Sequence, residues 1–141
     1  MTADEKYEGF SKEERAAMKE RAKELKAQAK HADATKDLLE KIAALDEPDR
    51  SKAQRIHELV TEHAPTLTPK AWYGMPGYAR DGKVVIFFQA ATKFDTRYPS
   101  LGFNDNAALD DGNMWPVAFA IEKLGAAEEK AIAALVKKAA G

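Results

Sequence analysis

The chain has 141 residues, long enough for one sizeable hydrophobic core and short for two. Its 22 Lys and Arg residues balance 23 Asp and Glu residues, which argues against nucleic acid as a partner, because phosphate binding needs a basic excess or a strong basic patch. It contains no cysteine, so disulfides, thiolate metal sites and cysteine nucleophiles are excluded.

The sequence predicts neither a signal peptide nor a membrane span. The opening residues, MTADEKYEGFSKEER, lack the apolar core of a signal peptide, and no stretch approaches the roughly 20 apolar residues of a span. The composition, 45% hydrophobic and 32% charged, is that of an ordinary globular protein. We therefore expect a cytoplasmic protein with no membrane partner.

Residues 1–45 are expected to form a helical extension, packed on or beside a domain of residues 46–141. Ser11 followed by Glu14 has the spacing of a capping box, with Phe10 as the apolar residue before the cap. Lys, Arg and Glu surround a thin apolar stripe at helical intervals, formed by Met18, Ala22, Leu25 and Ala29. So thin a stripe indicates a solvated helix, with partner binding as the alternative.

Two more helices are expected before the sequence changes character. A short one fits residues 36–45. The next is capped by Asp46, carries Pro48 in its first turn, where a missing N–H costs little, and ends at Pro65. Its core-facing side is formed by Ala53, Ile56, Leu59, Val60 and His63.

From Thr68 onward the hydrophobic period is that of strands. We expect short strands at 70–73 and 78–80, separated by a loop Gly74-Met75-Pro76-Gly77, and then a hairpin turn at Asp81-Gly82. The central strand is expected at 83–91, with Val84, Ile86, Phe88 and Ala90 on one side and Val85, Phe87 and Gln89 on the other. Two further strands are expected at 94–98 and 115–121.

A final helix is expected over residues 126–140, with Ile132, Leu135, Val136 and Ala139 as its apolar stripe. Lys137 and Lys138 complement the dipole at its C-terminal end. The predicted fold class is α+β: a two-layer sandwich with N-terminal helices, a five-stranded, mainly antiparallel sheet and a C-terminal helix.

Short motifs in a fixed order carry a resemblance to a known family. Trp72-Tyr73-Gly74-Met75-Pro76 and Gly82-Lys83, with the segments around them from about residue 48 to 140, resemble the YdhG-like family, whose members carry a domain of unknown function. The resemblance implies an α–β5–α sandwich with a layout related to frataxin. Some members are described as intracellular iron chaperones, so it also implies iron binding as one function.

Aromatic residues concentrate around the central strand, and they form the candidate binding site. Aromatic side chains supply contact area at low entropic cost, and polar tips orient a ligand. We expect a pocket on one sheet face that binds a small molecule or a peptide, lined by Trp72, Tyr73, Met75, Pro76, Tyr78, Arg80, Phe87, Gln89, Tyr98 and Trp115. The alternative is that the Tyr73–Tyr78 segment is a tight turn whose aromatics complete the core.

Metal binding is the second hypothesis, and no cofactor is expected unless iron binds. Glu58 and Glu62 share a helix face, and Asp110 and Asp111 are adjacent carboxylates of the kind that hard cations prefer. Against this, Asp110-Asp111-Gly112 is common turn chemistry and lacks the alternating acids of a calcium loop.

Catalytic motifs are missing from the sequence. Ser11, Ser51 and Ser100 carry no Gly-x-Ser-x-Gly motif or neighbouring base, and no zinc-protease spacing occurs. We therefore favour a non-enzymatic binding module, either a monomer or a homodimer. A third hypothesis is an oligomerising role in which the aromatic face pairs two copies.

Overall fold

The computed structural model describes Gly9 and residues 11–141, and internal contacts divide the chain into two units, Met1–Asp33 and Ala34–Gly141. Phe10, expected to precede the first helix cap, lies outside the described residues. The first long element, α2, runs from Lys12 to Ala43.

Helix α2 is continuous, so the prediction of a separate helix at 36–45 is wrong. No Gly or Pro occurs between its ends, and the backbone hydrogen bonds therefore continue without interruption. Its start is as predicted, because the Glu14 N–H donates to Ser11 Oγ at 3.1 Å. The apolar stripe at Met18 and Leu25 is exposed.

The larger unit begins inside α2, whereas we expected the domain to begin at Asp46. Leu38 is fully buried, and Ile42 and Leu45 are also buried in the hydrophobic core of this unit. The last turns of the helix therefore belong to the core rather than to an extension.

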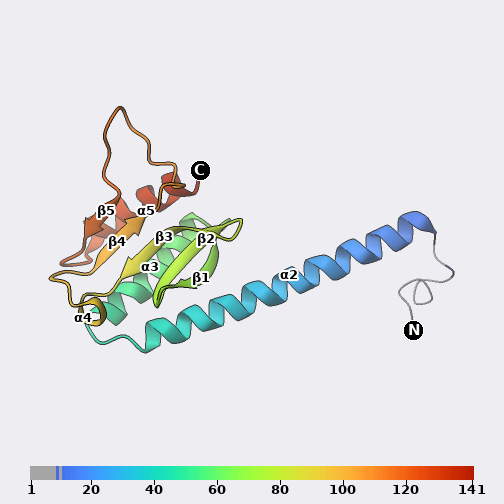
Figure 1. Ribbon diagram of the computed structural model, residues 1–141, viewed down its shortest axis with the longest axis horizontal. Helices are drawn as coiled ribbons and strands as arrows, with labels where there is room; N and C mark the ends of the chain where they lie inside the picture. Colours follow the sequence, from blue (N-terminus) through green and yellow to red (C-terminus); the bar gives the residue numbers. More distant parts are fainter. Residues whose placement is uncertain (1–8, 10) are drawn as a thin grey trace. The chain divides into compact units, whose positions relative to one another are not determined.

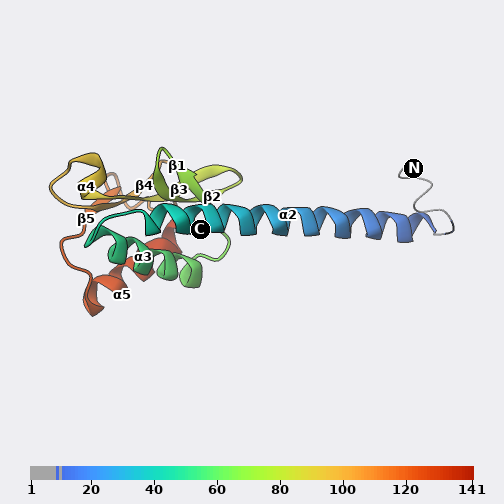
Figure 2. The ribbon, with the colours of Figure 1, turned by 90° about the horizontal axis from the view of Figure 1, so that it is seen from below.

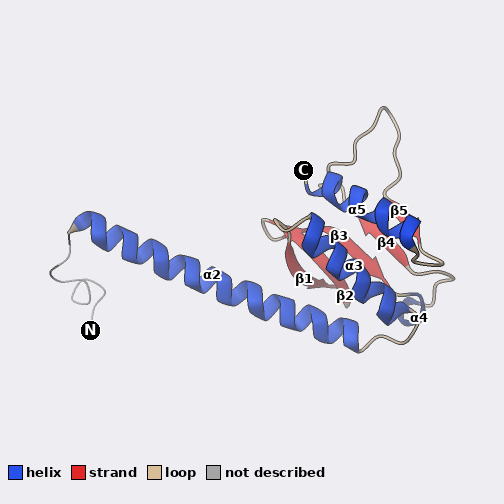
Figure 3. Cartoon of the chain, turned by 180° about the vertical axis from the view of Figure 1, so that it is seen from behind, coloured by secondary structure: helices blue, strands red, loops and turns tan. Residues whose placement is uncertain are grey.

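Two helices form one layer of the unit, as the predicted fold class requires. Helix α3 (Asp49–His63) and helix α5 (Ala126–Ala140) lie side by side on the same face of the sheet (Figures 2 and 3). Helix α5 has the expected bounds. At the start of α3 the carboxylate of Glu47 accepts hydrogen bonds from Ser51 N–H and Oγ–H, at 2.9 and 2.6 Å. This side chain, rather than that of Asp46, bonds the first turn.

The second layer is a five-stranded antiparallel meander in the order β1-β2-β3-β4-β5 (Figure 1). The strands are β1 (Thr68–Trp72), β2 (Met75–Arg80), β3 (Lys83–Gln89), β4 (Ser100–Phe103) and β5 (Ala118–Ala120). The fifth strand is shorter than the predicted 115–121. Its first expected residues, including Trp115, belong to the preceding loop.

The loop predicted at Gly74–Gly77 is instead part of β2. The β1–β2 hairpin turns on two residues only, Tyr73 and Gly74, both with positive φ (49° and 76°), and Trp72 pairs with Met75. Positive φ at both positions is the geometry of the type I′ turn that matches strand twist. Pro76 lacks an N–H, and pairing with β3 begins one residue later, at Gly77. The Met75–Pro76 bond is trans; the one cis bond among the described residues precedes Pro48.

The strand predicted at 94–98 is also wrong. A single helical turn, α4 (Ala91–Phe94), occupies this region and ends at Asp95, whose φ is 53°. Asp49 Oδ2 accepts hydrogen bonds from the Thr92 N–H and hydroxyl, at 3.1 and 3.0 Å. A side chain distant in sequence therefore accepts the hydrogen bonds from the start of this helical turn. The local alternation of residues gives no sign of such a long-range contact.

A β-bulge changes which side chains of β3 share a face. Tyr78 pairs with Ile86 but Ala79 pairs with Val84, so Val85 is the extra residue, buried in the core. As a result Val84 lies on the same face as Phe87, whereas we expected it beside Ile86. Ile86 and Phe88 face the helices, as predicted.

Candidate functional site

The sheet face opposite α3 and α5 carries an aromatic cluster. We call this face, with Lys70, Trp72, Gly77, Val84, Phe87, Gln89 and Gly102, the open face; strand register places these residues on one side. The ring centroids of Trp72 and Phe87 are 5.0 Å apart, and those of Trp72 and Tyr73 are also 5.0 Å apart. Both spacings are typical of favourable aromatic pairs.

Glycine makes room for this cluster. The Phe87 ring lies directly over Gly102, and a Cβ added there would come within 2.3 Å of Phe87 Cζ. Phe87 therefore lies flat along the sheet, and Trp72 reaches it from two strands away.

A cavity of about 490 Å³ adjoins the cluster on the open face. Trp72 and Val84 give it apolar walls, and the hairpin at Gly82 and the loop after β4 give it polar ones. The lining residues are Lys70, Trp72, Gly82, Lys83, Val84, Asn104, Asp105 and Asn106. Its size suits a small ligand.

Hydrogen bonds hold the polar side of this cavity. Lys70 Nζ donates to the Gly82 carbonyl at 2.9 Å, and Asn104 Nδ2 donates to the Val84 carbonyl at 2.9 Å. Asn106 Oδ1 is buried and receives no hydrogen bond from the described residues. A buried acceptor without a donor is costly unless a water or a ligand satisfies it.

Tyr73 is largely exposed, although its ring packs against Trp72 at the β1–β2 turn. It occupies the left-handed region, which disfavours residues with a Cβ, yet its side chain is 80% exposed. An exposed aromatic residue kept in a costly backbone conformation points to a role outside the core.

Tyr78 was predicted to line the pocket but faces the helices. It is 1% exposed, and its hydroxyl lies 3.0 Å from His57 Nδ1 on α3. Burial raises the pKa of Tyr78, and burial also lowers the pKa of His57 despite the opposing charge of Glu58. The Tyr78–His57 pair therefore joins the two layers in neutral form.

The other predicted pocket residues divide between the open face and elsewhere. Gln89 is half-buried on the open face, where it pairs with Ser100. Met75 is buried but pairs with Trp72 on the open face, as expected, whereas Pro76 is buried with its side chain on the other face. Arg80 donates to the carbonyls of Ala140 and Asn106, at 2.7 and 2.6 Å, so it braces the end of α5 and the loop that lines the cavity.

Tyr98 and Trp115 lie in other surroundings. The Arg97 guanidinium lies 5.0 Å from the Tyr98 ring centroid, and Tyr98 lines a separate cavity of about 470 Å³ with Asp49 and Thr92. Trp115 is partly buried and packs against the hydrophobic core. Trp72, Tyr73 and Phe87 are thus the aromatics that the fold brings together.

Four residues that line the cavity were not predicted from the sequence: Lys70, Val84, Asn104 and Asn106. The alternation of β1 was sufficient to place Lys70 beside Trp72. The two asparagines lie just after a strand that was not predicted, and Val84 was assigned to the opposite face because the bulge leaves no mark in the alternation.

The carboxylates considered for metal binding lie apart from this site. Glu58 forms an ion pair with Arg55 at 2.9 Å, whereas Glu62 is exposed farther along α3. Asp110 and Asp111 are exposed in the loop before β5. Among the described residues, no group of three or more His, Asp or Glu side chains is placed to hold a metal ion.

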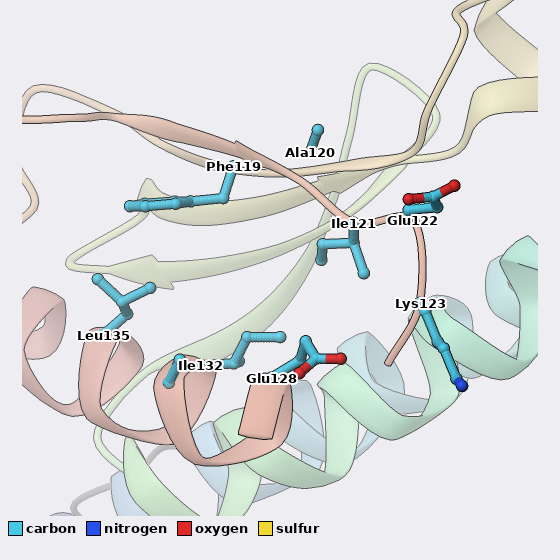
Figure 4. Close-up of a pocket in the computed structure, with 9 residues that line it drawn as sticks. Phe119, Ala120, Ile121, Glu122, Lys123, Glu128, Ile132 and Leu135 are labelled. Carbon is cyan, nitrogen blue, oxygen red and sulfur yellow. The ribbon is translucent and has the colours of Figure 1, made fainter. Parts of the chain in front are cut away.

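A third cavity, of about 370 Å³, lies between β5 and α5 (Figure 4). Phe119 and Ile121 point from the strand toward Ile132 and Leu135 on the helix, and Ala120 points to the opposite side. The complete lining is Phe119, Ala120, Ile121, Glu122, Lys123, Glu128, Ala131, Ile132 and Leu135. The cavity is mainly apolar and opens beside the last strand of the sheet.

The fold and the site define an α+β sandwich with helices on one sheet face and a cavity bordered by aromatics on the other. Within the described part of the chain, no helix has the length and apolar character needed to cross a membrane. Comparisons of the sequence with family models and characterised proteins, and of the structure with solved structures, give no match. The YdhG-like resemblance therefore rests on the sequence motifs alone.

Proposed function

We propose that this protein is a non-enzymatic, cytoplasmic binding module, and that its open face takes a small molecule with a flat apolar part and an anionic group. The observation that carries the proposal is the Trp72–Phe87 pair beside a cavity of about 490 Å³. Membership of the YdhG-like family belongs to the same proposal and is supported by the motifs around Trp72.

The chemistry of the cavity gives each part of the ligand a partner. The Trp72 ring and the Val84 side chain offer apolar area for a planar group. Lys70 and Lys83 lie at the rim with one acid, Asp105, which favours an anionic group. A donor on the ligand would satisfy Asn106 Oδ1.

Aromatic carboxylates that also carry a hydroxyl donor for Asn106 Oδ1, beginning with 4-hydroxybenzoate and 6-hydroxy-2-naphthoate, are suitable probes. In a Trp115→Phe protein the remaining tryptophan, Trp72, reports binding by fluorescence, and amide shifts at residues 104–106 locate the ligand. We expect Trp72→Ala to weaken binding by about tenfold or more, measured by those amide shifts.

Two controls make the experiment decisive. Met114→Ala removes an apolar side chain that is 90% exposed in the loop before β5 and should leave affinity unchanged. Lys70→Ala should weaken binding of the carboxylates more than that of their neutral amides. Unchanged affinity in Trp72→Ala, or shifts confined to the β5–α5 cavity, would contradict the assignment.

The iron alternative has no supporting cluster within the described residues and remains a prediction from the resemblance. Titration with ferrous and ferric iron, read at Glu58, Glu62, Asp110 and Asp111, tests it separately.

A further inference from the structure

The two edges of the sheet differ in how they are protected. Edge strands usually carry a Pro or a charged residue that prevents pairing with another chain. Strand β1 has both, in Pro69 and Lys70. Strand β5 and the two residues beside it that also bond to β4 or to the residue before it, Val117 and Ile121, read Val-Ala-Phe-Ala-Ile and have neither; Pro116 and Glu122 lie just outside this stretch.

The free backbone groups of β5 point away from the sheet. The Val117 carbonyl accepts from the Phe103 N–H, and the Ile121 N–H donates to the Pro99 carbonyl, both at 2.8 Å. Because backbone groups alternate along a strand, those of Ala118 and Ala120 point to the opposite side, where no strand of the described chain pairs with β5.

The helix below this edge is complementary in charge to a reversed copy of itself. Helix α5 has an acidic first turn, where Glu129 is paired with Arg55 on α3 and Glu128 lies on the β5 side, and a basic last turn with Lys137 and Lys138. A twofold axis beside β5 makes two copies of α5 antiparallel, so that acidic and basic ends face each other and the helix dipoles oppose. Ala131 and Ala134 are exposed and small, which allows close approach.

We propose that β5 and α5 form a homodimer interface in which two β5 strands pair antiparallel about Phe119 and join the two sheets. Ala118 then pairs with Ala120 of the second copy, which satisfies the outward-pointing backbone groups of both. The exposed Val117, 50% accessible in the single copy, lies opposite Ile121 of the second copy and covers the cavity between β5 and α5. The inference is independent of the proposed function, because it uses a different surface.

Val117→Lys tests the interface with little effect on the fold, because this side chain is already half exposed. In the dimer it places a charge against the apolar cavity, and we expect the dissociation constant to rise by at least about tenfold. Met114→Lys introduces the same charge three residues earlier, in the loop, and should leave dimerisation unchanged. Sedimentation of the full chain from micromolar to millimolar concentration measures both.

A second variant separates this interface from association through helix α2, whose exposed stripe includes Leu25. Leu25→Lys should not change the dissociation constant. In a mixed sample of labelled and unlabelled chains, we expect intermolecular NOEs between Val117 and Ile121. The proposal is overturned by a chain that stays monomeric at every concentration. It is also overturned if Leu25→Lys abolishes the dimer and Val117→Lys leaves it intact. That result would show that the chains associate through α2 and that β5 stays free, for example to bind another protein.

Discussion

His57 and Tyr78 form the polar contact through which α3 is tied to the middle of the sheet. The Nδ1 atom and the hydroxyl are 3.0 Å apart, and the two rings are stacked with centroids 5.9 Å apart. The hydroxyl is buried and stays protonated, and a hydroxyl can either donate to Nδ1 or accept from Nδ1–H, so the direction of this hydrogen bond follows the tautomer of His57. Burial disfavours the charged imidazole, so the folded chain favours the neutral form of His57.

This arrangement predicts a pH-dependent stability. Burial lowers the pKa of His57 below its usual 6.5, so the unfolded chain binds a proton more readily than the folded one. The contribution is complete above about pH 6.5 and is lost as the pH falls through the folded-state value. Urea unfolding between about pH 7.5 and pH 5 should therefore show a falling free energy of unfolding.

His57→Gln should flatten this slope, whereas His63→Gln, on the same helix but without the tyrosine contact, should keep it. Equal slopes in the wild type and the His57 variant would show that acid destabilisation arises elsewhere.

At the scale of elements, helix α4 depends on a side chain from another part of the chain. Asp49 is 1% exposed and accepts both hydrogen bonds from Thr92, joining the start of α3 to the segment after β3. We expect Asp49→Ala to lower the free energy of unfolding by about 1–3 kcal/mol, because the Thr92 N–H and hydroxyl lose a charged acceptor.

Asp46→Ala is the matched control for this change. Asp46 is exposed, and it is the acid that sequence reasoning chose as the helix cap. Denaturant unfolding should place this variant within about 0.5 kcal/mol of the wild type. A larger loss from Asp46→Ala than from Asp49→Ala would reverse the roles assigned to them.

Elements that are set by local signals were predicted well from the sequence, whereas elements that depend on distant contacts, such as α4, were not. Helix α5 and the Asp81–Gly82 turn follow from local signals, a regular apolar stripe and a dipeptide with positive φ. The turn at Tyr73–Gly74 was missed because Tyr is an unusual first residue for it. The second strand was therefore predicted to begin at Tyr78, whereas β2 begins at Met75. As a consequence, Tyr78 was placed in the pocket rather than on the face that packs against the helices.

The aromatic half of the candidate site could be predicted from the sequence, but the polar half could not. Trp72, Tyr73 and Phe87 were expected together, and the sheet register does bring them together. The polar half of the cavity comes from the loop after β4, whose position depends on Arg80 and on the bulge at Val85. Neither produces a periodic signal in the sequence.

At the scale of the whole molecule, the unit Ala34–Gly141 contains the complete hydrophobic core. A chain beginning at Ala34 should unfold with the same denaturant midpoint as the full chain, since none of the described residues before Ala34 buries a side chain in the core. A chain beginning at Asp46 loses Leu38, Ile42 and Leu45 as well, and should be less stable by several kcal/mol.

Thermal and urea unfolding of the two shortened chains measure this difference. Similar stability of both would mean that the last turns of α2 contribute little to the core. An unstable chain from Ala34 would mean that the preceding helix stabilises the fold.

The unequal edges of the sheet also limit the stoichiometry of any assembly built on it. Once β5 is paired with a second copy, the two outermost strands of the joined sheet are both β1. Pro69 and Lys70 in each of these strands disfavour pairing with any further strand. Such an arrangement closes at two subunits, whereas a sheet with both edges unprotected would extend into a filament.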